Sequence, residues 1–315
     1  MVPFSSIAGM MFTIIAAFFV PVIGAIVLCA AGRLRWKAVI AGFFFYGLSQ
    51  ALLRLPLLWL FYQIPGMTSF VYSNLLGNAL VMGLSAALSE ECMRYVGARF
   101  AMGRRGQPVT GRDALGYGLG HSIAETFFVM GLTAFTNLML AFALNQTGLS
   151  GYAEQFGQEE ALQVYQVLTG TPALQFAAGG VERLLYTLVQ ICLTALVFYG
   201  VRRKNWRYPL LAAGAHFLFI AGVSLMQPHG VWMGEGYVLV FAVMMAALCL
   251  PVLRRLWRMD EKKGLEKPEE SAEQPQTKES KTRVERPAGF STLLFCNQKE
   301  FRNVYFCKEG KPVAK

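Results

Sequence analysis

Long apolar stretches, separated by short polar connections, make up most of the first 256 residues. A membrane-spanning helix needs about 20 mostly apolar residues, because no backbone polar group can stay unpaired in hydrocarbon. Seven stretches meet this requirement, at residues 7–31, 38–62, 73–98, 114–142, 174–200, 208–226 and 237–256. The pattern predicts an all-α polytopic membrane protein with about seven transmembrane helices.

The connections between these predicted helices alternate between basic and non-basic. Lysine and arginine gather after the first helix near Lys37, after the third near Arg105 and after the fifth near Lys204. The intervening connections, including residues 145–172, contain no Lys or Arg. By the positive-inside rule we expect the N-terminus outside and the C-terminus in the cytoplasm, with the first helix retained as an anchor. Residues 153–168 fit either an amphipathic helix on the outer surface or a structured loop.

Composition supports a multi-pass protein of the plasma (inner) membrane. Of the 315 residues, 55% are hydrophobic and 15% charged, whereas an ordinary soluble domain has roughly 25% charged residues. A soluble globular enzyme is therefore excluded. The net charge of +10 sits largely in loops, where it sets topology, so we expect lipid and membrane-associated partners and no nucleic acid.

The last part of the chain differs from the rest. Residues 257–315 contain 13 of the 29 Lys and Arg and 10 of the 19 Asp and Glu, with many Pro, Ser and Gln. Such a segment cannot bury enough apolar surface to offset its ordering entropy. We therefore predict two parts, a membrane-embedded domain over residues 1–256 and a charged, disordered cytoplasmic tail over residues 257–315.

Ionisable residues inside the predicted spans are the strongest functional signal. Each costs about 2.5 to 3.5 kcal/mol to insert, so each needs a partner or a purpose. They are Arg54, Glu90, Glu91, Arg94, His121, Glu125, Glu182, Arg183 and His216.

Depth in the bilayer groups three of these residues together. Glu90, His121 and His216 each lie nine residues from a flanking arginine, which puts them at one level, roughly 13 Å below the basic anchors. Amide hydrolysis needs an activated water, a base, an acid and donors for the oxyanion. A carboxylate and two imidazoles can supply these groups.

Helical spacing predicts the local pairings. Arg94 can contact Glu90 or Glu91, and His121 can donate to Glu125, because residues three or four apart share a helix face. Neighbouring helix positions point about 100° apart, so we expect that Glu90 and Glu91 cannot face one partner. Arg54 and Glu182 fall at similar depth in the outer half of the membrane, where a structural ion pair is the favoured interpretation.

Two other questions stay open at this stage. His121, His216 and Glu90 or Glu91 would suit Zn²⁺, yet no HExxH motif is present, and a metal-free site with histidines as oxyanion donors fits equally well. A transporter or proton-coupled membrane protein, or a non-catalytic scaffold, is the alternative function. A transporter should show inverted repeats, and the sequence shows none.

Four segments together resemble the successive motifs of a known family. They are SEECMRY at 89–95, GYGLGHSIAE at 116–125, GGVERLLYTLVQICL at 179–193 and AAGAHFLFIAG at 212–222. In this order and spacing they resemble the YhfC family of predicted intramembrane proteases, which is related to the CAAX-protease and bacteriocin-processing superfamily.

The resemblance implies an intramembrane endopeptidase in which a glutamate activates water to attack a peptide bond. It implies catalytic roles for Glu90, Glu91, His121 and His216, with Arg94 as the motif arginine. Glu125, Glu182 and Arg183 match positions typical of the YhfC branch.

Two departures from the wider superfamily accompany the resemblance. Ile220 stands where Asn or Asp usually follows the last histidine by four residues, which removes a polar group expected to help bind water or the oxyanion. The spacing from Glu-Glu to Arg is also one residue shorter, as in the YhfC form.

Overall fold

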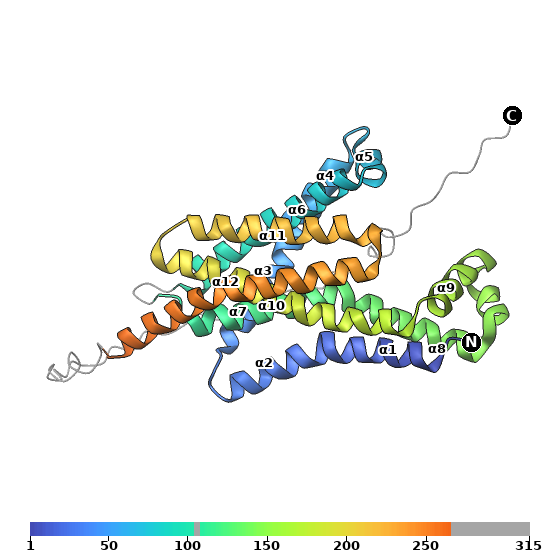
Figure 1. The fold of residues 1–315 in the computed structure, drawn as a ribbon, viewed down its shortest axis with the longest axis horizontal. Helices are drawn as coiled ribbons and strands as arrows, with labels where there is room; N and C mark the ends of the chain where they lie inside the picture. The colour runs from blue at the N-terminus through green and yellow to red at the C-terminus, as the bar shows by residue number, and fades with distance from the viewer. Residues whose placement is uncertain (104–107, 266–315) are drawn as a thin grey trace, which may run out of the picture. The chain divides into compact units, whose positions relative to one another are not determined.

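The structure is a computed structural model that describes residues 1–103 and 108–265. Within these ranges, side chains are described up to Asp260. Its described residues form helices joined by short connections, without strands (Figure 1). By length and composition, six helical stretches can cross a membrane, or seven if one sharply bent pair of helices counts as a single span. The predicted all-α polytopic fold is confirmed.

The first four candidate spans contain short π-helical turns. The first is α1 (Phe4–Ile14), η1 (Ile15–Phe19) and α2 (Val20–Ala30), and the second is α3 (Trp36–Leu48), η2 (Ser49–Arg54) and α4 (Leu55–Tyr62). The bent pair is α5 (Met67–Ser73) and α6 (Leu75–Val96), which continues as η3 (Gly97–Met102). The next is α7 (Gly111–Thr126), η4 (Phe127–Gly131) and α8 (Leu132–Phe156).

The remaining spans are α-helical through most of their length. They are α10 (Ala173–Arg203), α11 (Arg207–Met226) with the 3₁₀ turn η5 (Gln227–His229), and α12 (Val231–Leu265). Between α8 and α10 lies α9 (Gln158–Gly170). Residues 153–168 are therefore helical on both sides of a break at Gly157, and the place of this segment on the outer surface stays a prediction.

The third span departs from a straight helix. The axes of α5 and α6 meet at 110°, and the break lies at Asn74, whose backbone is extended and whose side chain accepts a hydrogen bond from the Gly77 N–H at 3.0 Å. An asparagine favours such a cap because its side chain replaces the missing helical acceptor. The site residues of this span all lie on α6, after the break.

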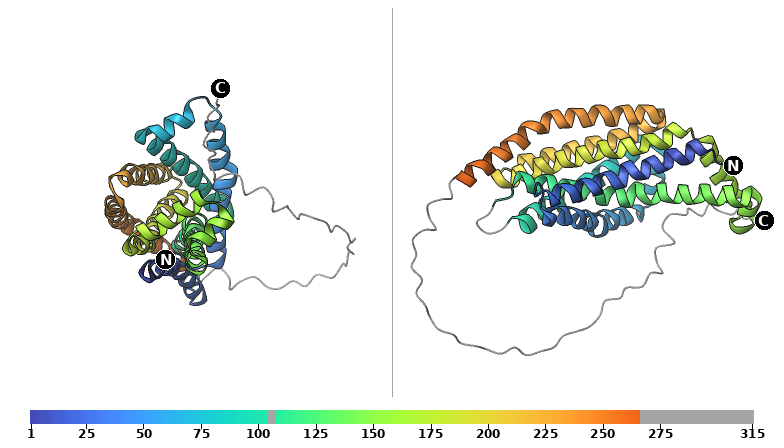
Figure 2. Two further views of the ribbon diagram at one scale, coloured as in Figure 1. Left: turned by 90° about the vertical axis from the view of Figure 1, so that its right-hand side faces the viewer. Right: turned by 90° about the horizontal axis from the view of Figure 1, so that it is seen from below.

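The helix α10 is the most buried of the candidate spans, and it contacts α1, α7, α11 and α12 (Figure 2). Beside it, α3 and α7 pack with very close backbones. A Cβ at Gly120 would collide with the carbonyl oxygen of Val39, and one at Gly42 would collide with that of Tyr117. Small residues permit this approach, which fixes the position of His121, the residue after Gly120.

The end of α12 is tied to two other helices. Asp260 accepts a hydrogen bond from the Gly111 N–H at 2.8 Å and pairs with Arg202, which also donates to the Val109 carbonyl at 2.8 Å. The helix therefore continues past position 256, the predicted end of the membrane domain, because Asp260 has partners on α7 and α10. The predicted disorder over the rest of the tail lies outside the described residues from position 266 on.

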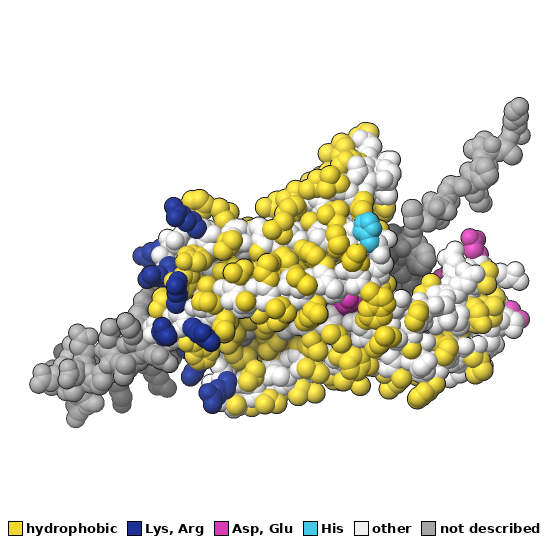
Figure 3. All heavy atoms as spheres, in the orientation of Figure 1, with side chains coloured by type: hydrophobic (Ala, Val, Ile, Leu, Met, Phe, Trp, Pro, Cys, Tyr) yellow, Lys and Arg dark blue, Asp and Glu magenta, His cyan; other side chains and the backbone are white. Residues whose placement is uncertain are grey.

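Charge is separated along the described part of the molecule. On the face drawn in Figure 3, lysine and arginine side chains gather at one end, acidic side chains lie near the middle and at the other end, and an apolar surface lies between. At the basic end, Asp113 and Asp260 are paired with Arg35 and Arg202. This separation follows the alternation of the loops in the sequence. The orientation of the two ends across the membrane stays a prediction of the positive-inside rule.

Candidate active site

The predicted catalytic residues meet in the interior. Glu90 and Glu91 come from α6, His121 from α7 and His216 from α11, and each side chain is at most 5% exposed. Glu90 Oε2 lies 3.1 Å from His121 Nε2 and 3.7 Å from His216 Nε2. The prediction that three helices bring a carboxylate and two imidazoles to one level is confirmed.

His216 lies between the two glutamates. Its Nδ1 is 2.8 Å from Glu91 Oε1, while its Nε2 faces Glu90. The expectation that Glu90 and Glu91 cannot face one partner is therefore wrong. An imidazole carries nitrogens on two sides of its ring, so one ring can contact two carboxylates that leave the helix in different directions.

Arg94 connects most of the site. It pairs with Glu91 through Nη1, and its Nη2 lies 2.8 Å from His121 Nε2 and donates to Gln190 Oε1 at 2.5 Å. The guanidinium is fully buried, so these contacts replace the water that it lacks. The expectation that Arg94 sits beside one of the paired glutamates is confirmed, with Glu91 as the partner.

Glu125 belongs to the cluster through another residue than predicted. It accepts a hydrogen bond from Gln190 Nε2 at 2.7 Å. His121 Nδ1, the free nitrogen of that ring, is buried without a partner. The predicted hydrogen bond from His121 to Glu125 is therefore absent between these described side chains, although both belong to one buried group.

Two glutamines in this cluster escaped the sequence analysis. Gln190 joins Arg94 to Glu125, and Gln50 donates to Glu90 Oε1 at 3.1 Å. Neither residue carries a charge, but a primary amide inside an apolar span also needs partners. That burial requirement is the signal that could have found both residues.

Arg54 and Glu182 do not form the predicted ion pair. Arg54 Nη1 lies 4.0 Å from Glu90 Oε1, at the edge of the buried cluster. Glu182 instead pairs with its neighbour Arg183 at 2.6 Å, and the Arg183 guanidinium lies 3.8 Å from the centre of the Tyr186 ring. Counting residues gives the depth of a side chain in the membrane but not the direction in which it leaves the helix. Arg54 and Glu182 leave their helices toward different neighbours.

Hydrogen-bond geometry at His121 suggests a place for a cation. Arginine can only donate, so His121 Nε2 accepts from Arg94 and carries no proton. An imidazole nitrogen has one lone pair, which Arg94 occupies here, and a Glu90 oxygen lies 3.1 Å from the same nitrogen. That distance is close to the spacing of about 3.3 Å between two ligands of a tetrahedral zinc ion, so a bound ion would take the lone pair in place of the Arg94 hydrogen bond. A shared positive charge would remove the repulsion between these two acceptors.

The donor set also fits a metal ion. Glu90, His121 and Glu125 each offer a ligand atom, and these atoms all lie within 4.8 Å of one another. His216 Nε2 and Glu91 Oε2 are buried beside this group without hydrogen-bond partners. The group of three possible ligands thus contains Glu125 where the sequence predicted His216. His216 Nε2 lies nearby, 3.7 Å from Glu90 Oε2.

Comparison with known proteins identifies the family to which the chain belongs. The model of the YhfC intramembrane metalloprotease family matches residues 16–244, which include every residue of the cluster. The uncharacterized membrane protein YhfC of Bacillus subtilis (strain 168) is 31% identical over 191 residues, covering 59% of this chain and 71% of that protein. No solved structure matches the chain. This multi-pass integral membrane protein belongs to the YhfC intramembrane metalloprotease family.

Proposed function

We propose that this protein is an intramembrane endopeptidase that hydrolyses a peptide bond of a membrane-associated peptide or protein. The observation that carries the proposal is the buried group of Glu90, His121 and His216, whose Glu90 oxygen lies within 3.7 Å of both imidazoles. Buried ions in a membrane protein are expensive and mark functional sites by default. Membership of a metalloprotease family supports the same conclusion.

The geometry around Glu90 suggests where the attacking water binds. Glu91 is ionised beside Arg94 and accepts from His216 Nδ1–H, so the free His216 Nε2 and Glu90 Oε2 are both acceptors, 3.7 Å apart. That distance is too long for a direct hydrogen bond. A water next to both atoms would donate one proton to each, which leaves its lone pair for the substrate carbonyl.

In the reaction, the water oxygen forms a bond to the carbonyl carbon while its proton passes to the Glu90–His216 pair. The carbon–nitrogen bond then breaks, and the same proton is delivered to the leaving amine, which returns the Glu90–His216 pair to its starting protonation state. Gln50 and Arg94 hold Glu90, Glu91 and His121 in place through the contacts described above.

The same residues could hold a zinc ion. Glu90, His121 and Glu125 would be its ligands, which corresponds to the three protein ligands and open position of catalytic zinc sites. When bound, the ion would polarise the substrate carbonyl and acidify water. Removal of the water proton would still fall to the side chains beside it, with His216 Nε2 as the free base.

The proposal is tested by comparing membranes that carry wild type, Glu90→Gln or Glu182→Gln. Glutamine keeps the shape of glutamate but removes the basic oxygen, so uncut membrane proteins should accumulate with Glu90→Gln. Glu182→Gln is the matched control, because it removes a carboxylate that lies in a membrane span and is paired outside the cluster. Equal cleavage by wild type and the Glu90→Gln, Glu91→Gln double variant would refute the protease. Loss of solute or proton flux without any change in cleavage would favour the transporter.

A further inference from the structure

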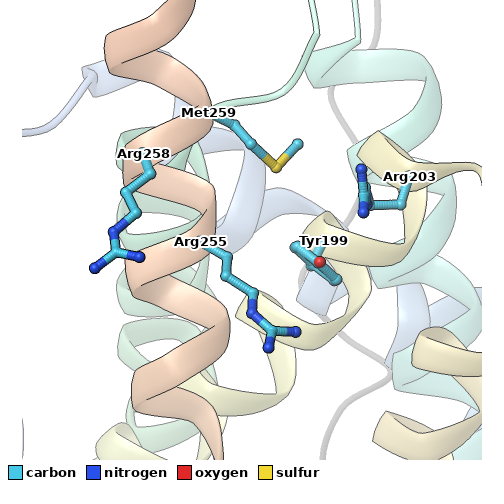
Figure 4. Close-up of a pocket in the computed structure, with 5 residues that line it drawn as sticks. All are labelled: Tyr199, Arg203, Arg255, Arg258 and Met259. Carbon is cyan, nitrogen blue, oxygen red and sulfur yellow. The ribbon is translucent and has the colours of Figure 1, made fainter.

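A cavity of about 280 Å³ lies at the basic end, between the last turns of α10 and residues 255–259 of α12. Tyr199 and Arg203 line it from α10, and Arg255, Arg258 and Met259 line it from α12. Figure 4 shows Arg255 and Met259 extending from α12 toward Tyr199, with Arg203 beyond them, while Arg258 leaves the helix on its other side. None of the residues that line this cavity belongs to the catalytic cluster.

The three arginines have no acidic partner among the described side chains. Among the described acidic side chains, Asp260 is next to them in sequence, and it is paired with Arg202 and the Gly111 N–H. Arg203 and Arg255 bring two like charges to one cavity, where they repel each other, so an anion bound between them would be favourable. Guanidinium groups match phosphate oxygens through paired N–H donors.

The surroundings of the cavity indicate a lipid rather than a soluble anion. On α12, Leu248 and Leu250 are 63% and 47% exposed, and the arginines begin one turn later. The helix therefore passes from a hydrocarbon-facing surface directly to this cavity, as expected at the level of lipid headgroups. Met259 and the buried ring of Tyr199 add an apolar wall.

We propose that this cavity binds the phosphate of an anionic phospholipid, with Arg203 and Arg255 as its main ligands and the acyl chains along the exposed leucines of α12. The site is independent of the proposed protease activity. The proposal assigns an anionic phospholipid to these arginines, whose presence the positive-inside rule explains only by overall charge.

The test titrates the full-length protein in detergent with phosphatidylglycerol, phosphatidylcholine or inorganic phosphate, and measures binding by native mass spectrometry and melting temperature. Wild type should bind phosphatidylglycerol and melt at a higher temperature, with no such effect of phosphatidylcholine or phosphate. Arg255→Gln and Arg203→Gln should each weaken binding about tenfold, because each removes charge-assisted hydrogen bonds. Arg255→Lys should restore part of the affinity.

Arg254→Gln is the matched control, since it removes the same charge from the adjacent, exposed position, which does not line the cavity. It should bind like wild type. An equal loss with Arg254→Gln and Arg255→Gln would overturn the proposal in favour of a diffuse charge effect. Equal stabilisation by inorganic phosphate would overturn the lipid as ligand. If Arg255→Gln fails to fold, Arg203→Gln on the other helix decides the outcome.

Discussion

Replacing Arg94 by lysine should weaken the whole cluster, although the charge is kept. Lysine can retain the ion pair with Glu91, but its single nitrogen cannot also occupy the Nη2 position that lies 2.8 Å from His121 and donates to Gln190 at 2.5 Å. Two buried hydrogen bonds made by a charged group are then lost, each worth about 1.5 to 3 kcal/mol. We expect the free energy of unfolding to fall by about 3 to 5 kcal/mol.

The assay is reversible unfolding of the purified protein in mixed micelles, followed by circular dichroism. Arg99→Lys is the matched control, because this arginine is exposed on the same span, and its change should stay within about 0.5 kcal/mol. A double-mutant cycle of Arg94→Lys with Gln190→Leu should show a coupling of about 1 to 3 kcal/mol, since the two side chains share a bond. A cost below 0.5 kcal/mol for Arg94→Lys, or strictly additive effects, would refute the network.

Three further predictions concern chemistry, the end of α12 and topology. Glu90→Gln should lower proteolytic activity by about 10²- to 10⁴-fold. Adding His216→Ala should lower it little more, because the effects of residues that act as a unit are not additive. Additive losses in a peptide-cleavage assay would contradict a water bound by both Glu90 and His216. Asp260→Asn should lower the free energy of unfolding by about 1 to 3 kcal/mol, because it weakens the contacts with Arg202 and the Gly111 N–H. Thermal unfolding measures this loss, and an unchanged melting temperature would show that these contacts do not stabilise the protein. In a cysteine-free background, a membrane-impermeant thiol reagent should label a cysteine at Gln158 from outside but not one at Lys204, and the reverse pattern would invert the orientation.

The sequence predicted the spans and the depth of the site because both depend on constants of the helix. Hydrocarbon thickness sets the length of an apolar stretch, and a rise of about 1.5 Å per residue converts spacing into depth. Glu90, His121 and His216 were found in this way. Averaged hydropathy hid the break at Asn74, because one polar residue changes the mean of a window little while it redirects the chain by 110°.

The direction in which each side chain leaves its helix could not be predicted from the sequence. Arg54 and Glu182 share a depth but face different neighbours, and the partner of Arg54 depends on how α3 packs and on the π-helical turn that follows it. Gln190 was missed because a neutral amide gives no charge signal, although it is fully buried and forms hydrogen bonds with two ionisable side chains. Pairing inside the cluster thus follows from packing, which spacing alone does not determine.

The π-helical turn η2 has a consequence for how chain length affects the site. A π turn closes its hydrogen bond over five residues instead of four, so it accommodates one more residue than an α turn while the flanking helices keep their packing. Deleting Gln50 would allow this turn to become α-helical, with α3 still against α7, yet Glu90 would lose its amide donor. A relative with one residue fewer here would retain the fold and lack this contact, and a comparison that counts only substitutions would overlook the difference.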